Sequence, residues 1–253
     1  MRTLFVALVV ATMTLILAPV VIVARLLGVS QGPTSIYAKS VRLWARSINF
    51  AAGVRLRVHG RENLANARGA VFIANHVSWF DIFALASEVS WSSFVAKAEL
   101  RRIPLFGFAA ETVGIVFIDR ENRKSAFESY QLVAEKIRKG LSVVVCPEGT
   151  RGKSYALRPF KKGPFVLAIA AHAPVVPVVV YGAREVQPKG SFRIHSGTVH
   201  VHLLEPVPTE GYDYEHRHEL MRTVWERMAE LLRTEYGVVS EGDAIAPPRR
   251  QSA

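Results

Sequence analysis

The residues best suited to chemistry lie in one short stretch, from Asn75 to Asp81. His76 supplies an imidazole, whose ordinary pKa suits proton transfer near neutral pH, and Asp81 supplies a carboxylate five positions later. On one continuous helix, five positions turn the chain by about 500°, so the two side chains would lie about 140° apart. They can meet only if His76 precedes the helix that carries Asp81.

Ser78 gives a reason to place His76 outside that helix. A serine followed three residues later by an acidic residue is a capping-box pattern, with Ser78 as the N-cap and Asp81 in the first turn. A first-turn carboxylate can reach back to the imidazole, fix its tautomer and stabilise its charged form. A second interpretation stays open, in which Asp81 only caps the helix and His76 is a loop residue.

Short apolar runs rich in β-branched residues alternate with helical patterns along the rest of the chain. The runs predict strands at 54–58, 70–73, 94–96, 115–118, 141–146, 175–180 and 198–204. Helical patterns cover 35–50, 82–86, 125–139, 165–171 and 215–236. Continuously apolar strands separated by helices predict an α/β layered domain, in which helices flank a mostly parallel or mixed central sheet.

The N-terminal run from Thr3 to Ala24 contains no charged residue. As a helix it would be about 33 Å long, against a hydrocarbon core of about 30 Å. Pro19 weakens it as a simple span, so we expect membrane attachment and leave spanning open. Basic residues follow the run and hardly precede it, which would place the body on the cytoplasmic side if the run does span.

These patterns divide the chain into three predicted segments. Residues 1–52 are predicted to be a membrane anchor followed by a basic amphipathic helix, which suits a membrane interface but could be an ordinary domain helix. Residues 53–237 form the predicted catalytic domain. Residues 238–253 lack apolar periodicity and are expected to be a disordered tail.

Composition points to a membrane surface, acidic substrates, or both. The chain has 253 residues, is 50% hydrophobic and carries a formal net charge of +11. Nucleic acid is the alternative explanation of the charge, but no aromatic-plus-basic motif or zinc-finger spacing supports it. The single cysteine, Cys146, excludes a disulfide within the chain.

Polar and basic residues follow two of the predicted buried strands. Arg120 comes after 115–118, and the segment 147–151, Pro-Glu-Gly-Thr-Arg, comes after 141–146. Ligands of open α/β sheets gather beyond the carboxyl ends of strands, and the arginine fork suits a phosphate. Taken singly, an arginine after a strand is usually a solvated loop residue.

Four segments together resemble the motifs of the glycerolipid acyltransferase family, in the family's order and spacing. They are Asn75-His76-x4-Asp81 and the segments 114–120, 147–151 and 176–179, and the resemblance covers about residues 58–205. Within the family the chain resembles the bacterial 1-acylglycerol-3-phosphate acyltransferases. The resemblance implies an enzyme of phospholipid biosynthesis that transfers an acyl group from a thioester to the free sn-2 hydroxyl of 1-acylglycerol-3-phosphate, giving phosphatidic acid.

The resemblance also implies roles for particular residues. His76 would be the general base and Asp81 its partner. The acceptor's phosphate pocket would be formed by Lys97, Arg120, Glu148, Gly149, Thr150 and Arg151. No cofactor is implied, since acyl-CoA or acyl-acyl carrier protein would be the co-substrate. The implied location is the cell inner membrane, with the active site facing the cytoplasm.

Other functions remain open on the sequence alone. The acceptor could be another lysolipid, such as a lysophospholipid or a lyso-aminolipid, or the same pair could activate water in a thioester hydrolase. A non-catalytic lipid-binding protein is a further class. His200 and His202 share one face of a strand, but with no third ligand evident we predict no metal site.

Overall fold

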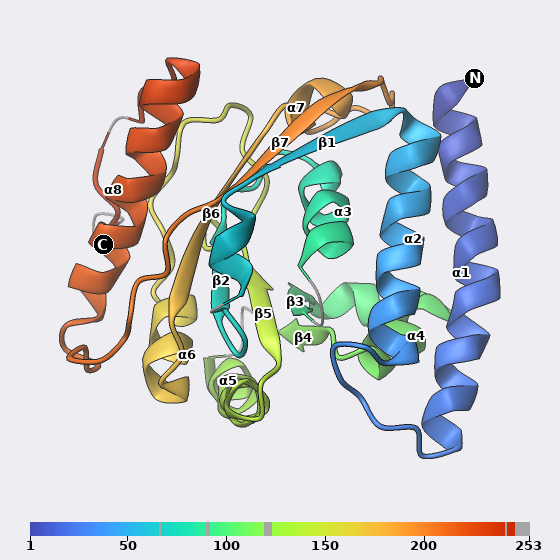
Figure 1. Ribbon diagram of the computed structural model, residues 1–253, viewed down its shortest axis with the longest axis horizontal. Helices are drawn as coiled ribbons and strands as arrows, with labels where there is room; N and C mark the ends of the chain where they lie inside the picture. Colours follow the sequence, from blue (N-terminus) through green and yellow to red (C-terminus); the bar gives the residue numbers. More distant parts are fainter. Residues whose placement is uncertain (66, 90–91, 119–122, 241, 246–253) are drawn as a thin grey trace, which may run out of the picture.

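The computed structural model describes residues 1–65, 67–89, 92–118, 123–240 and 242–245, with the backbone alone at Lys97 and at 123–129. Among these residues a seven-stranded sheet has helices on both faces (Figure 1). The strands are β1 (Val54–His59), β2 (Val71–Ala74), β3 (Ser92–Lys97), β4 (Val116–Ile118), β5 (Ser142–Val145), β6 (Val175–Tyr181) and β7 (Gly197–Leu203). The helices are α1 (Arg2–Leu26), α2 (Ile36–Ala52), η1 (Arg61–Leu64), α3 (Trp79–Glu88), η2 (Ala98–Arg102), α4 (Phe106–Thr112), α5 (Arg123–Arg138), α6 (Gly163–Ala171), α7 (Ala183–Val186) and α8 (Arg217–Tyr236).

The strand order is β1-β7-β6-β2-β5-β3-β4. Every neighbouring pair is parallel except β6 and β7, which are antiparallel. The predicted mostly parallel or mixed sheet is therefore confirmed. Because β2 lies between β5 and β6, the segments that follow β2 and β5 leave the sheet side by side.

Alternation along β2 accounts for the two layers of helices. Val71 and Ile73 belong to the core cluster that contains α5, α6 and α8, whereas Phe72 and Ala74 belong to the cluster that contains α2 and α3. Successive strand residues point to opposite faces, so a strand that is buried on both faces is continuously apolar. All four residues of β2 are buried.

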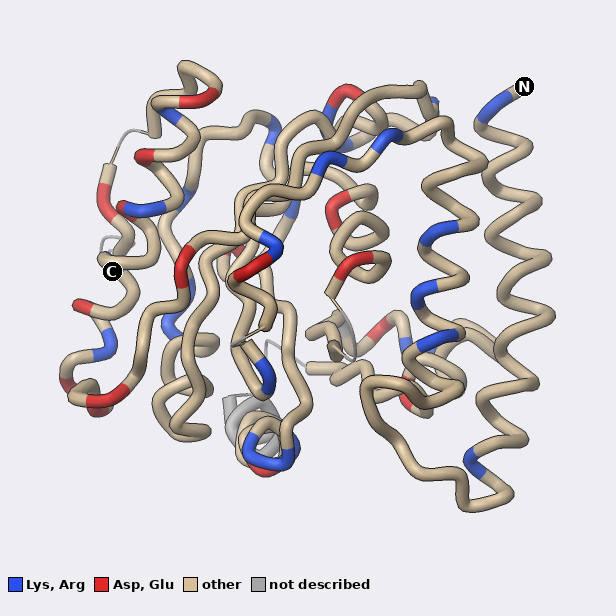
Figure 2. The backbone as a smooth tube through the Cα atoms, in the orientation of Figure 1, with Lys and Arg blue, Asp and Glu red and all other residues tan. Residues whose placement is uncertain are grey.

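α1 is a continuous helix through Pro19 that is long and apolar enough to cross a membrane. Four of its residues are buried against the protein: Val6, Ala18, Val21 and Ala24. Large apolar side chains such as Leu4, Leu8 and Leu15 are exposed instead. Figure 2 shows Lys and Arg only at the two ends of this helix. An apolar surface of this extent on one helix is expected to face lipid.

α2 lies between α1 and α3, and it belongs to the core of the domain. Ala45, Ile48 and Ala52 are fully buried in the same cluster as Phe72 and Phe80. The opposite side of the helix carries its basic residues, of which Lys39 and Arg46 are exposed and Arg42 is partly exposed. One side of α2 therefore packs with the domain that follows it, and its other side is left for a membrane interface, since the two sides of an amphipathic helix can have different partners. The division of the chain at residue 52 stays a prediction.

The expectation of a disordered tail from Val238 is wrong for its first residues. Ala244 is 1% exposed, its carbonyl oxygen accepts a hydrogen bond from the Phe160 N–H at 2.7 Å, and Ser240 Oγ accepts one from the Leu157 N–H. The segment is held by the 157–160 loop, which is distant in sequence. Local periodicity carries no sign of such contacts. Residues 241 and 246–253 lie outside the described residues.

Candidate active site

The connection from β2 to α3 holds His76 just outside the helix. Ser78 is the N-cap of α3, and it forms with Asp81 the capping box that the sequence predicts. Asn75 anchors the start of the connection, since its side chain donates to the Val180 carbonyl oxygen and accepts from the Val180 N–H. The connection is thus tied to β6 at one end and to a helix cap at the other.

Asp81 reaches back to His76, as the capping geometry predicts. His76 Nδ1 lies 2.9 Å from Asp81 Oδ2, which also accepts the backbone N–H groups of Val77 and Ser78 at 2.7 and 2.8 Å. The Asp81 side chain is 0% exposed and that of His76 is 14% exposed. Asp81 Oδ1 is also buried and has no hydrogen-bond partner among the described residues.

This geometry fixes the tautomer of the imidazole. A carboxylate can only accept hydrogen bonds, so Nδ1 of His76 carries the hydrogen and donates it to Asp81. Nε2 is then the nitrogen with a free lone pair, and it can accept a proton from a substrate. His76 lines a cavity of the protein. The pair has the arrangement of a general base and the carboxylate that orients it.

The loop that follows β5 supports His76 from the other side. Glu148 Oε1 accepts the His76 N–H at 3.1 Å, and the His76 carbonyl oxygen accepts the Gly152 N–H at 2.6 Å. Gly149 has φ +81°, a conformation that favours glycine. A Cβ there would also lie 2.8 Å from the end of the Lys161 side chain. The two loops therefore hold one another through backbone and side-chain contacts.

Glu148 lies behind the cavity wall and does not line the cavity. Its side chain is 3% exposed, and Oε2 accepts from Arg158 Nε at 2.8 Å. Burial raises the pKa of Glu148, while the hydrogen bond and charge of Arg158 act in the opposite direction. Arg158 also donates to the side chain and the carbonyl oxygen of Thr150. The arginine thus fastens the loop that carries Gly149, Thr150 and Arg151.

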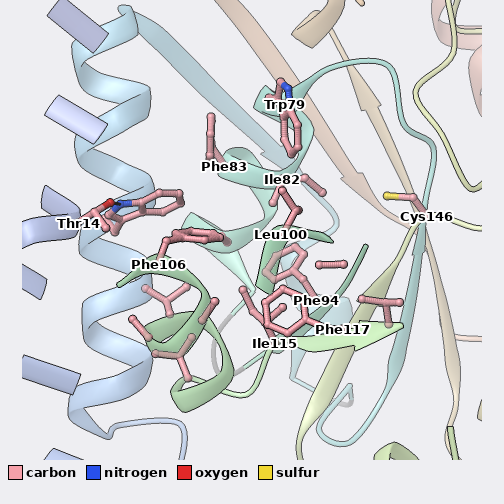
Figure 3. A pocket seen from close by; sticks show the side chains of 18 of the residues that line it. Thr14, Trp79, Ile82, Phe83, Phe94, Leu100, Phe106, Ile115, Phe117 and Cys146 are labelled. Carbon is pink, nitrogen blue, oxygen red and sulfur yellow. Dashed lines mark hydrogen bonds between the residues drawn. The ribbon is translucent and has the colours of Figure 1, made fainter. Parts of the chain in front are cut away.

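The cavity has a volume of about 520 Å³ and a largely apolar lining. Figure 3 shows aromatic and aliphatic side chains converging on it from α3, β3, η2, α4 and β4, with Cys146 across the cavity from them. Its walls extend from His76 to Thr14, Leu17, Ala18 and Val21 of α1. The space beside the proposed base therefore continues to the apolar N-terminal helix, and it suits a long hydrocarbon group.

Polar and basic groups are concentrated near His76. Gly149, Thr150, Arg151 and Lys189 line the cavity there. The Arg151 guanidinium lies 5.0 Å from the centre of the Trp79 ring, and Lys189 Nζ donates to the Arg151 carbonyl oxygen at 2.6 Å. Cation–π contact and this hydrogen bond hold Arg151 at the polar part of the cavity.

The structure brings together some of the candidate residues and does not place others. Gly149, Thr150 and Arg151 line the cavity with His76. Arg120 and the side chain of Lys97 lie outside the described residues. Sequence reasoning missed Arg158 and Lys189. Their only signal was a positive charge between predicted elements, which most surface lysines and arginines share.

Comparison with known proteins assigns the family. A family model described as Acyltransferase matches residues 55–181. The 1-acyl-sn-glycerol-3-phosphate acyltransferase BAT2, chloroplastic, of Brassica napus is 35% identical over 168 residues, which cover 66% of this chain and 48% of that protein. The 1-acyl-sn-glycerol-3-phosphate acyltransferase alpha of Homo sapiens is 33% identical over 175 residues, which cover 68% of this chain and 62% of that protein. The chain thus spans from about half to under two thirds of these two relatives.

Two further similarities cover more of both chains. An uncharacterized acyltransferase of Schizosaccharomyces pombe is 33% identical over 208 residues, 79% of this chain and 72% of that protein. The crystal structure of PlsC, the 1-acyl-sn-glycerophosphate (LPA) acyltransferase of Thermotoga maritima, superposes with a TM-score of 0.75 at 26% identity, covering 91% of this chain and 94% of that one. The chain belongs to the acyltransferase family.

Proposed function

We propose that the protein transfers an acyl group from a thioester to the free sn-2 hydroxyl of 1-acylglycerol-3-phosphate and so forms phosphatidic acid. The observation that carries the proposal is the His76–Asp81 pair at an apolar cavity that extends to α1. The names of the relatives from Brassica napus and Homo sapiens support this acceptor. The donor is acyl-CoA or acyl-acyl carrier protein, whose negative charge suits a chain of net charge +11.

In this mechanism His76 Nε2 takes the proton of the acceptor hydroxyl as its oxygen attacks the thioester carbonyl carbon. Asp81 stabilises the imidazolium through the Nδ1 hydrogen bond. Collapse of the tetrahedral intermediate breaks the carbon–sulfur bond and leaves the new ester. The departing thiolate takes the proton from His76, which restores the neutral base. The reaction requires no covalent intermediate on the protein.

Arg151 and Lys189 are the described cations best placed for the acceptor's phosphate. Both line the cavity near His76, and the planar guanidinium can donate two hydrogen bonds to phosphate oxygens. In this proposal Arg120 and Lys97 add to the same group. Gly149 and Thr150 shape the pocket, and Glu148 acts from behind it by holding His76 and Arg158.

The lipid reaches the site from the membrane in this proposal. α1 presents exposed leucines outward, and four of its residues form part of the cavity wall. Residues 1–52 attach the protein to the membrane, and residues 53–237 carry the reaction, with α2 belonging to both parts. In this proposal the membrane is the cell inner membrane and the active site faces the cytoplasm. The basic residues that follow α1 favour this orientation if α1 spans the bilayer.

The function is tested by acylation assays of the full chain in lipid vesicles. Lysophosphatidic acid, a lysophospholipid with a larger head group, a lyso-aminolipid and an uncharged monoacylglycerol are each offered with acyl-CoA or with acyl-acyl carrier protein. We expect fast acyl transfer to lysophosphatidic acid alone. A preference for another lysolipid would mean that this lysolipid, and not lysophosphatidic acid, is the acceptor. Thioester loss without acyl-lipid formation would identify a hydrolase and overturn the proposal.

Arg151→Ala tests the phosphate site within that function. Loss of charge-assisted hydrogen bonds worth about 1.5–3 kcal/mol should lower kcat/KM for lysophosphatidic acid about 10- to 150-fold, with little effect on monoacylglycerol. Arg193→Ala is the matched control, because Arg193 is exposed and does not line the cavity. An unchanged preference for the phosphate in Arg151→Ala would assign phosphate recognition to other cations.

Leu15→Arg tests the membrane role of α1. Leu15 is 64% exposed on α1, and Leu132 is 63% exposed on α5, so the two substitutions differ mainly in location. Leu15→Arg should reduce co-sedimentation with vesicles, since a charge on a lipid-facing side is costly, and Leu132→Arg should not. Equal vesicle binding by the two variants would mean that this side of α1 does not contact the membrane.

A further inference from the structure

Three histidines meet on the two adjacent strands at one edge of the sheet. His59 is the last residue of β1, and it lies directly across from His202 of β7 in the parallel register of the two strands. His200 is two residues before His202 and therefore points to the same face. The sequence shows only the pair on β7. The third histidine comes from a strand more than a hundred residues earlier in the chain.

The ring nitrogens of these histidines lie close enough to share one ion. Each residue offers a nitrogen, and the three nitrogens lie within 4.8 Å of one another. His59 Nε2 and His200 Nδ1 are 3.1 Å apart. Two nitrogens that bind one tetrahedral zinc ion at about 2.0–2.1 Å are about 3.3 Å apart. The contact between His59 and His200 thus already has the spacing of two ligands, although a shared proton would give a similar distance.

Tyr236, the last residue of α8, holds the third ring. Its hydroxyl lies 2.6 Å from His202 Nε2, which leaves Nδ1 as the other nitrogen of that imidazole. His202 also stacks on His59, with ring centres 4.2 Å apart. Histidines that bind a metal commonly have their second nitrogen fixed by a hydrogen bond of this kind. The ring of His202 is therefore oriented before any ion binds.

We propose that His59, His200 and His202 form a binding site for a divalent transition metal ion, best suited to zinc, with water at the fourth position. Three imidazoles are a ligand set that suits Zn²⁺, Cu²⁺ or Ni²⁺ and does not suit Mg²⁺ or Ca²⁺, which prefer oxygen. None of the three residues lines the cavity that contains His76. A bound ion would fasten the edge strand β1 to β7 and, through Tyr236, to the end of α8.

One positive charge near the site opposes binding. Arg57, which carries that charge, lies across from His200 in the strand register. The same charge would repel a metal ion. Removing it should strengthen binding without removing a ligand.

The first test measures metal binding by the full chain without a polyhistidine tag. After removal of metal with a chelator, the protein is titrated with Zn²⁺ and, separately, with Co²⁺, whose visible absorption reports tetrahedral coordination. We expect one ion per chain and a rise in the thermal unfolding temperature with added Zn²⁺, because a ligand that binds only the folded state stabilises it. This readout is independent of acyl transfer.

Variants locate the ion. His59→Gln removes an exposed ligand and should abolish the Co²⁺ spectrum, whereas the controls His195→Ala and His216→Ala should keep it. Tyr236→Phe should weaken binding about 10- to 100-fold, the usual effect of losing a partner of a ligating histidine. Arg57→Gln should tighten binding several-fold, since a like charge is removed.

Two results would overturn the proposal. Stoichiometric binding that survives in His59→Gln would place the ion elsewhere, with His216 and His218 as the residues to examine. Failure of the wild-type protein to bind Zn²⁺ or Co²⁺ at micromolar concentrations would leave a hydrogen-bonded histidine cluster in place of a metal site. His59→Gln is also compared with wild type in the metal-free state, which separates loss of a ligand from loss of folding.

Discussion

Among the residues that the structure describes, two His–Asp pairs have nearly the same local geometry. His76 Nδ1 lies 2.9 Å from Asp81, and His216 Nδ1 lies 2.8 Å from Asp213. In both pairs the aspartate also accepts two backbone N–H groups. The pairs differ in their surroundings. The first is 14% and 0% exposed beside a cavity, whereas the second is 51% and 67% exposed just before α8.

This comparison shows that the hydrogen bond alone does not make a catalytic pair. An imidazole held by a carboxylate is a common local motif, and at the surface water screens the charges of both groups. Only His76 lies beside a space that can hold a substrate, and only its partner is shielded from water. The exposed pair therefore serves as an internal control for the buried one.

The largest contrast is expected from removal of the two histidines. His76→Ala should reduce acyl transfer about 10²- to 10⁴-fold, because it removes the group that accepts the hydroxyl proton. His216→Ala should leave the rate unchanged. Steady-state kinetics on vesicles, with circular dichroism to check folding, provide the comparison. Similar rates in the two variants would mean that His76 is not the base.

Substitution of the aspartates should likewise lower the rate of acyl transfer in the buried pair and not in the exposed pair. Asp81→Asn should lower the rate on the order of 10²-fold or more while the protein stays folded, because an amide can keep part of the cap but cannot stabilise the imidazolium. Asp213→Asn should behave as wild type. A fully active Asp81→Asn would reduce Asp81 to a helix cap, the interpretation that the sequence leaves open.

Arginine–glutamate pairs extend the contrast between buried and exposed sites. Arg158→Ala leaves buried Glu148 without its cation, and it should destabilise the protein by about 1–3 kcal/mol at neutral pH. Because burial raises the pKa of Glu148, the favourable protonated form predominates below its ordinary value of 4.5 and is lost as pH rises through the raised value. The cost of Arg158→Ala should therefore grow from acid to neutral pH.

The control for that series is Arg233→Ala, which removes the partner of exposed Glu230. Its effect on stability should be small and should shrink further with added salt. Urea unfolding of both variants at about pH 4 and pH 7.5 measures the differences. A pH-independent cost of Arg158→Ala would show that Glu148 keeps its charge state across this range.

The smallest effect is expected from the pH dependence of the exposed histidine pair. The hydrogen bond and charge of Asp213 raise the pKa of His216, so its contribution to stability is present below the ordinary value of 6.5 and is lost as pH rises through the raised value. Contacts with His216 lower the pKa of Asp213, whose contribution is present above 3.8 and is lost as pH falls through the lowered value. Thermal unfolding of wild type and His216→Ala should therefore differ most between pH 3.8 and 6.5. A difference that persists at pH 9 would contradict this assignment.

Features set by neighbouring residues could be predicted from the sequence. Ser78 and Asp81 are three residues apart, so the helix start and the return of Asp81 to His76 follow from capping rules. The apolar runs likewise predict buried strands, because a strand covered on both faces has no polar side. The proposed roles of Arg120 and Lys97 remain predictions, because those side chains lie outside the described residues.

Features set by long-range contacts could not be predicted in this way. His59 joins His200 and His202 only because β1 pairs with β7. Arg158 reaches Glu148 across a loop, and Ala244 is buried by a segment far from it in sequence. In α2, the basic residues are visible in the sequence, but the burial of Ala45 and Ile48 depends on α3 and the sheet. Each of these contacts depends on the topology, which local patterns do not contain.

The wall that α1 contributes to the cavity links the order of synthesis to the completion of the candidate site. The ribosome produces residues 2–26 before any strand of the sheet, so this helix can enter a bilayer before the sheet forms. In a copy that misses the membrane, the exposed leucines of α1 stay in contact with water. Aggregation through these leucines would then compete with the docking of α1 on α2, which includes the hydrogen bond from Trp44 to Thr14. Without docked α1, the cavity beside His76 lacks the wall formed by Thr14, Leu17, Ala18 and Val21. Under the proposed function, a copy outside the membrane would therefore hold its substrate poorly.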